Sequence, residues 1–194
     1  ALEKGADTIG LVFRDVQEID KSFMKKLFEG VIIDCVGIHF MGCSSPDRLY
    51  HLFLEYALEQ GKELSQLTGS LDADPLGKMA LTGSFPEAEW NALPALISEA
   101  AVKTPAFRIL GINGKHFHNS GATLTQEIAI SLSMAQAYME LADGDTLTPE
   151  TIMRSMLFNL ATGPDYFPEI AKLRASRMLW AYDCTRWEVP RTTV

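Results

Sequence analysis

Cysteine is scarce in this sequence. The 194 residues include three cysteines, Cys35, Cys43 and Cys184, an odd number without the spacing of a metal site. A reducing cytoplasm is the simplest setting for such a chain, so we expect a cytoplasmic protein. Because Cys35 stands inside an apolar run, we expect its thiol to be buried.

Long apolar runs and basic clusters are also missing. The longest apolar stretch, Val31–Phe40, is interrupted by Asp34 and His39 and is too short to span a bilayer, so no membrane partner is expected. The net charge of −8 and the lack of any basic run argue against a nucleic-acid partner. A hydrophobic content of 47% with 22% charged residues is typical of a globular domain with a sizeable core.

The chain alternates between strand-like and helix-like segments. Five apolar runs predict strands at Thr8–Phe13, Val31–Phe40, Leu67–Leu71, Phe107–Ile112 and Ser155–Leu160. Helical patterns lie between and after them at Ile19–Phe28, Pro46–Glu59, Leu76–Leu81 with Glu87–Ala101, Thr125–Leu141 and Asp165–Ala181. Continuously apolar strands are typical of parallel sheets covered on both faces. Alternating units of this kind form either an open doubly wound sheet or a (β/α)8 barrel.

Two observations favour the barrel. No phosphate-binding glycine fingerprint follows the first strand, which counts against a dinucleotide-binding sheet. Polar residues recur where the predicted strands end: Asp15, His39, Asp72, Asp74, His116, His118, Asn159 and Thr162. Contributions from several successive strands fit the rim of a barrel better than a single crevice.

Five strands cannot close an eight-stranded barrel, which takes about 250 residues. We therefore expect an α/β fold that is a partial TIM (β/α)8 barrel of about five βα units, forming one domain over residues 1–194. Two open sheet edges would then invite partner contacts or aggregation. The first residues, Ala1–Asp7, read as the last turn of a helix that stops at Gly5, so we expect a piece of a longer protein.

The segment Gly111–Thr123 is the richest in polar side chains at a strand-to-helix junction. His116 at this position could act as a general acid or donate a hydrogen bond to a substrate carbonyl. Asn119 and Ser120, with the residues that follow, offer backbone N–H groups and hydroxyls just before a helix. They form either a cradle for an anion or carbonyl, or an ordinary helix cap.

A metal site is a second interpretation of the same segment. His116 and His118 lie two residues apart, so in a strand both would face the same side. They could bind a divalent metal if His39 or Asp72 supplied a third ligand. Alternatively, one imidazole bonds a loop carbonyl and the other is solvated.

Two further sets of charged residues have structural interpretations. Asp74 before Pro75 predicts a helix cap, while the role of Asp72 stays open. Lys172, Arg174 and Arg177 lie on the last predicted helix, where we expect them to be solvated or paired with carboxylates of a neighbouring helix.

Two stretches of the chain resemble the methylmalonyl-CoA mutase family. They are Ile112–Phe117 with Ser120–Thr123, and Glu169–Trp180, whose residue string is very specific to that family. Weaker similarity runs back through Leu67–Leu76 to Ala1. The resemblance implies strands two to six of the family's (β/α)8 substrate barrel, without the end of the barrel and without the C-terminal cobalamin-binding domain.

The resemblance implies a specific chemistry for the family. Its members interconvert methylmalonyl-CoA and succinyl-CoA by a radical route in which adenosylcobalamin supplies the radical and the acyl-CoA threads through the barrel. In the catalytic chains, a histidine at the place of His116 hydrogen-bonds the thioester carbonyl of the substrate.

This sequence departs from the catalytic pattern around that histidine. Catalytic chains carry Tyr where this chain has Lys115, and Gln followed by Glu where it has His118 and Asn119. A Gln-Asn-Asp run aligns with Asp72–Asp74. The arginine that holds the substrate carboxylate aligns with Thr82.

A cofactor-contacting loop is also expected to be missing, because Phe13 runs almost directly into Val16–Phe28. We therefore expect the small, non-catalytic subunit of a heterodimeric adenosylcobalamin-dependent mutase, paired with a large catalytic subunit. Acyl-CoA and adenosylcobalamin would belong to the holoenzyme, with no cofactor on this chain. His116 would be vestigial, and Asn119 and Ser120 are candidate substrate contacts. The alternatives are a catalytic acyl-CoA mutase chain using His116, or a metal-dependent barrel hydrolase using His116 and His118.

Overall fold

A computed structural model describes residues 2–13, 19–42 and 45–190, so Asp15, Val16 and Cys43 lie outside the described residues. The strands are β1 (Thr8–Val12), β2 (Gly37–Met41), β3 (Gly69–Ala73), β4 (Phe107–Ile112) and β5 (Met156–Phe158). The α-helices are α1 (Lys21–Leu27), α2 (Pro46–Glu59), α3 (Pro75–Thr82), α4 (Glu87–Lys103), α5 (Gly114–Asn119), α6 (Leu124–Met139), α7 (Pro149–Ser155) and α8 (Tyr166–Arg186). Short 3₁₀ turns, η1 (Leu2–Lys4) and η2 (Leu64–Gln66), complete the described elements.

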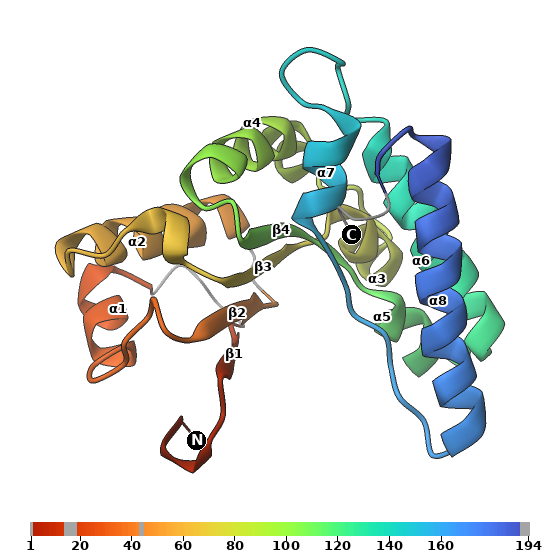
Figure 1. The fold of residues 1–194 in the computed structure, drawn as a ribbon, viewed down its shortest axis with the longest axis horizontal. Coiled ribbons are helices and arrows are strands. Elements are labelled where there is room, and N and C mark those ends of the chain that lie inside the picture. Colours follow the sequence, from red (N-terminus) through yellow and green to blue (C-terminus); the bar gives the residue numbers. More distant parts are fainter. Residues whose placement is uncertain (1, 14–18, 43–44, 191–194) are drawn as a thin grey trace. The chain divides into compact units, whose positions relative to one another are not determined.

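The strands follow one another in the order β1-β2-β3-β4-β5 in one sheet, and Figure 1 labels the first four of them. The pairs β1–β2, β2–β3 and β3–β4 are parallel. Helices alternate with the strands along the chain, which confirms the predicted α/β class and agrees with a partial mutase-type barrel.

The chain forms two compact units. Unit 1 comprises Ala1–Ala73 and Ala88–Gly111, and unit 2 comprises Asp74–Glu87 and Ile112–Val194. Each unit has its own buried core. The expected single barrel domain stays a prediction.

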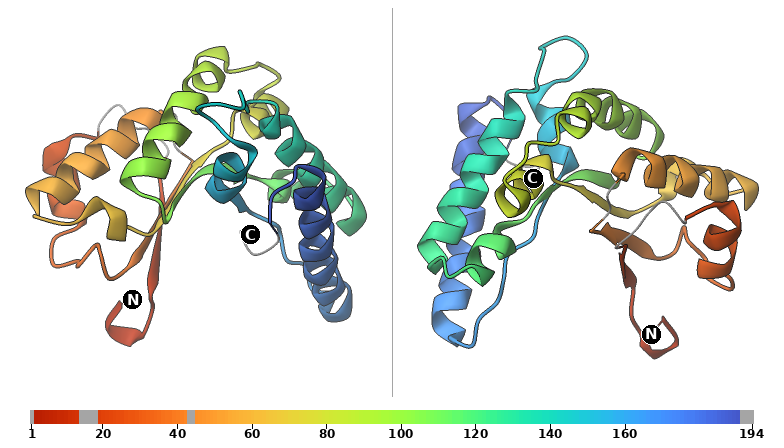
Figure 2. Two further views of the ribbon diagram at one scale, coloured as in Figure 1. Left: turned by 45° about the horizontal axis from the view of Figure 1, so that its top comes forward. Right: turned by 180° about the vertical axis from the view of Figure 1, so that it is seen from behind.

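Aromatic side chains form the centre of unit 1. The ring of Phe40 on β2 lies 5.1 Å from that of Phe53 on α2, and Phe53 lies 5.9 Å from Phe107 on β4. Tyr50 adds a buried hydroxyl, 2.8 Å from Oγ1 of Thr104. Helices α2 and α4 lie on the same side of these strands (Figures 1 and 2).

A glycine permits the close approach of β2 and β3. Gly69 has φ +141°, and a Cβ atom there would overlap the backbone carbonyl of Ile38. Only glycine combines this backbone conformation with the missing side chain, so Gly69 is required for the pairing of Ile38 with Gly69 in the sheet register.

The strand β2 is shorter than predicted. It begins at Gly37, whereas residues 31–36 form turns in which the N–H of Cys35 bonds the carbonyl of Ile32. Lys62 pairs with Asp34 at 2.8 Å in the same stretch. The prediction of a buried Cys35 is wrong, because its thiol lies in this turn and is exposed.

Helices α6 and α8 lie side by side in unit 2 (Figures 1 and 2). The side-chain amide of Gln136 on α6 donates to Asp183 on α8 at 3.2 Å. No helix in the described part of the chain has the length and apolar character needed to cross a membrane.

Candidate functional site

The ends of three strands supply a buried hydrogen-bond network in unit 2. Asp74 follows β3, Asn113 follows β4 and Asn159 follows β5. The Asn113 amide donates to Asp74 Oδ2 at 2.9 Å, and the Asn159 amide donates to Asn113 Oδ1 at 3.2 Å. Carboxyl ends of parallel strands meet at one edge, and two of the predicted strand-end residues, Asp74 and Asn159, are joined there through Asn113.

Asp74 has most of its hydrogen-bonding capacity occupied by groups inside the protein. Its Oδ1 accepts the N–H of Gly77 at 2.8 Å, which confirms the predicted cap of α3, and also accepts the hydroxyl of Tyr138 at 2.8 Å. The Tyr138 oxygen in turn accepts the N–H of Leu76 at 3.2 Å. The residue is 4% exposed, so its bonds serve folding and leave little capacity for a ligand.

The histidines lie in a helix and not in a strand. A shared side for His116 and His118 is expected only if they lie in a strand. Instead α5 covers Gly114–Asn119, and two residues span about 200° of an α-helix. Gly114 allows this helix to pack tightly, since a Cβ there would overlap Ser131 Oγ. Within residues 2–13, 19–42 and 45–190, no group of three His, Cys, Asp or Glu could hold a metal ion.

Asn119 and Ser120 lie at the C-terminal end of α5 and are exposed. The hydroxyl of Ser120 donates to the carbonyl of His116 at 2.9 Å, so it satisfies the end of its own helix. The next helix, α6, is capped by Thr123, whose Oγ1 accepts the N–H of Gln126. A substrate contact by Asn119 or Ser120 stays a prediction.

A buried charge cluster of Glu127, Glu169 and Lys172 lies beside α5. The Lys172 ammonium is 2.9 Å from Glu127 Oε2 and 2.7 Å from Glu169 Oε2, and it donates to the carbonyl of Ala161 at 2.6 Å. This confirms the expected pairing of Lys172 with a carboxylate of a neighbouring helix. Arg174 and Arg177 are exposed.

The same two carboxylates hold the segment after β5. Glu127 Oε1 accepts the N–H of Ala161 at 2.7 Å, and Glu169 Oε1 accepts the N–H of Gly163 at 2.9 Å. Side chains from both α6 and α8 therefore hold residues 161–163 in place through hydrogen bonds to the backbone.

Charge pairing shifts the protonation equilibria of this cluster. The ammonium of Lys172, with the N–H of Gly163, holds the pKa of Glu169 below its ordinary value. Burial acts to lower the pKa of Lys172, but its contacts with Glu169 and Glu127 outweigh that effect and raise it. His118 Nδ1 lies 3.5 Å from Glu127 Oε2 and is buried.

His39, the other candidate metal ligand with Asp72, belongs to unit 1. Its Nδ1 lies 2.9 Å from Ser70 Oγ, and the two residues are register partners on β2 and β3. Asp72 is half-buried with φ 55°, an uncommon conformation outside glycine.

Sequence reasoning missed Tyr138, Glu127 and Glu169 as members of the site. The spacing of Glu169 and Lys172, three residues apart on one helix, is the one local signal for the charge cluster. Glu127 and Tyr138 are joined to their partners across long stretches of chain, and no local pattern marks them.

Comparison with known proteins gives concordant matches. The model of the family described as methylmalonyl-CoA mutase matches residues 13–191. The methylmalonyl-CoA mutase small subunit of Porphyromonas gingivalis is 30% identical over 181 residues, which cover 93% of this chain and 29% of that protein. The methylmalonyl-CoA mutase of Rhizobium meliloti is 29% identical over 160 residues, 81% of this chain and 22% of that protein.

The large subunit from Porphyromonas gingivalis is 26% identical over 161 residues, 81% of this chain and 22% of that protein. The chain therefore spans less than a third of the length of these relatives.

Proposed function

Because this chain belongs to the methylmalonyl-CoA mutase family, we propose that it is part of the small, non-catalytic subunit of a heterodimeric mutase. The holoenzyme interconverts methylmalonyl-CoA and succinyl-CoA with adenosylcobalamin, and this chain pairs with the large catalytic subunit in the cytoplasm. The higher identity to a small subunit than to a large subunit of the same organism supports this assignment.

The observation that carries the proposal concerns Thr82. It stands where the resemblance places the arginine that holds the substrate carboxylate. Its hydroxyl donates to the carbonyl of Lys78 at 2.8 Å, at the end of α3. A neutral hydroxyl that already donates to a carbonyl of its own helix cannot hold a carboxylate as a guanidinium does, because the guanidinium is permanently charged and binds through two hydrogen bonds.

The surroundings of His116 support the same proposal. Lys115, His118 and Asn119 replace the residues of the catalytic pattern. The His118 ring faces the carboxylate of Glu127. This imidazole lies against the internal charge cluster, and His116 is left as a half-buried vestige of the shared fold.

Adenosylcobalamin does not fit the strand-end groups of this chain. Asp74 and Asn113, with Asn159 and Tyr138, spend their hydrogen bonds on one another. A corrin ring needs polar groups directed at its side chains, so we derive no chemical step through the cofactor here and assign its binding, like that of acyl-CoA, to the partner.

The catalytic alternative keeps His116 as the donor to a thioester carbonyl. Its support is positional, since α5 begins directly after β4. The hydrolase alternative needs His116 and His118 on one metal. The helical geometry does not support that pairing.

The test is turnover of methylmalonyl-CoA by this chain alone, with adenosylcobalamin supplied, and by the chain mixed with a large subunit. We expect no turnover alone and co-purification with the large subunit. His116→Asn should leave the rate of the mixed enzyme unchanged. Turnover by the isolated chain that His116→Asn abolishes would instead establish the catalytic alternative.

A further inference from the structure

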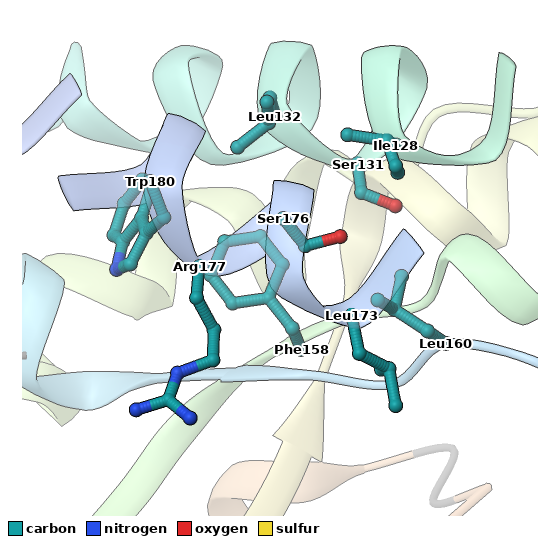
Figure 3. A pocket seen from close by; sticks show the side chains of 9 residues that line it. All are labelled: Ile128, Ser131, Leu132, Phe158, Leu160, Leu173, Ser176, Arg177 and Trp180. Atoms are coloured by element: carbon teal, nitrogen blue, oxygen red, sulfur yellow. The ribbon is translucent and has the colours of Figure 1, made fainter. Parts of the chain in front are cut away.

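An apolar groove of about 370 Å³ lies in unit 2 between α6, α8 and the segment from β5 onward (Figure 3). Ile128 and Leu132 form its α6 wall, while Leu173 and Trp180 line it from α8. The ring of Phe158 on β5 packs against Trp180 at 5.0 Å. The volume is within the range of small-molecule sites, which are typically apolar with a few polar groups.

The groove lies on the opposite face of the β5 segment from the strand-end network. Successive side chains of an extended strand alternate between its faces. Phe158 and Leu160 line the groove, whereas Asn159 between them bonds Asn113. A ligand in the groove would therefore be independent of the candidate site and of the proposed subunit role.

The polar side chains that line the groove indicate which charge a bound ligand would carry. Ser131 donates its hydroxyl proton to the carbonyl of Glu127 at 2.7 Å, and Ser176 donates to that of Lys172 at 2.8 Å, so neither hydroxyl offers its proton. Arg177 remains. Its guanidinium forms no ion pair with any other residue that the structure describes, and in Figure 3 it extends away from the α6 wall.

We propose that this groove binds a medium-chain aliphatic carboxylate, with the chain along the apolar walls and the carboxylate on Arg177. Guanidinium binds carboxylates in a two-point geometry, and the exposed end of the groove places that pair at the solvent boundary. The lining stretch of α8, Leu173 to Trp180, spans about 10 Å of helix, which sets the length of chain that the groove can hold. Decanoate has this size.

The test is a titration of the 194-residue chain with decanoate, decanol and decyl phosphate, followed by the fluorescence of Trp180 in a background where Trp90 and Trp187 are replaced by Phe. We expect saturable binding of decanoate, and at least about tenfold weaker binding of decanol, which lacks the charge. Equal binding of decanol and decanoate would overturn the proposal. Tighter binding of decyl phosphate would overturn the choice of a carboxylate in favour of a phosphate.

Three variants locate the site. Arg177→Gln should weaken decanoate binding at least about tenfold, and Ser176→Leu should fill the groove and abolish it. The matched control, Arg174→Gln, removes an exposed arginine of the same helix outside the groove and should bind as the parent does. Equal losses in the two arginine variants would overturn the proposal as non-specific attraction to α8.

Light scattering on the same samples tests a protein occupant. Dimerisation that Ser176→Leu abolishes, without decanoate binding in the parent, would assign the groove to a second copy of this chain. Matching unfolding temperatures of all variants establish that each is folded when it is titrated.

Discussion

Replacing Lys172 by Met tests whether the buried charge cluster holds unit 2 together. The side chain keeps its length but loses the ammonium that contacts Glu127, Glu169 and the carbonyl of Ala161. Both the lysine and Glu127 have fully buried side chains. Removing one partner of a buried ion pair costs about 3–5 kcal/mol, because the remaining charge stays buried without compensation. Since whole domains are stable by about 5–15 kcal/mol, a loss of this size is readily measured.

The pH dependence of this stability loss tests the reasoning more sharply than its size at one pH. Lys172 lowers the pKa of Glu169, so in the parent this carboxylate stabilises the fold at neutral pH and its contribution is lost as the pH falls through the folded-state pKa. In Lys172→Met, the group that lowers the pKa of Glu169 most is gone, whereas the N–H of Gly163 still lowers it, so the folded pKa should move up toward the unfolded value. The variant should then lose less stability on acidification than the parent does, so its stability deficit relative to the parent shrinks as the pH falls.

The assay is urea unfolding followed by tryptophan fluorescence at pH 7 and pH 5. His118, 3.5 Å from Glu127, is the other titratable group at the cluster, so His118→Gln is measured in both backgrounds. Arg174→Met, an exposed site on the same helix, should change stability by less than about 0.5 kcal/mol. A cost below about 1 kcal/mol for Lys172→Met at pH 7, or a deficit that stays constant down to pH 5, would refute the reasoning.

Three other predictions rest on single contacts. Gly69→Ala should cost about 3 kcal/mol or more, or prevent folding, because its Cβ would overlap β2 at a positive φ; a parent-like unfolding midpoint would contradict this. Tyr138→Phe should cost about 1–2 kcal/mol in urea unfolding, since Asp74 loses a buried donor, and a neutral result would mean that water replaces the hydroxyl. Asp143 should titrate by NMR with a pKa of about 2, because the hydroxyl of Thr146 and three backbone N–H groups stabilise its charge; an ordinary carboxyl pKa would contradict the loop geometry.

The strand and helix order could be read from the sequence because apolar runs and helix starts are local signals. Pro46 and Pro75 stand at the first turns of α2 and α3, as predicted. The apolar run Val31–Phe40 misled because its first six residues form turns whose bonds include the distant Lys62. Cys35 is exposed because it lies in these turns and not in a buried strand.

The helix α5 could not be foreseen for a related reason. Its six residues include a glycine and two histidines, which are weak helix formers, and six residues are too few for a periodic signal. Contacts with other segments stabilise it: Lys115 donates its N–H to the carbonyl of Asn159 at 3.0 Å, and Gly114 packs against Ser131. The metal hypothesis assumed an extended backbone at His116 and His118, and this segment is helical instead.

Buried polar groups at strand ends either bind a ligand or stabilise the fold. The hydrogen bonds that each group already forms distinguish these two roles. A catalytic carboxylate must keep acceptor capacity for its substrate, whereas Asp74 accepts from Gly77, Tyr138 and Asn113. Glu127 and Glu169 likewise spend one oxygen each on the backbone after β5 and the other on Lys172. The polar residues at the strand ends therefore bond one another. This arrangement agrees with the proposed structural role, because satisfied polar networks fix a fold without a bound substrate.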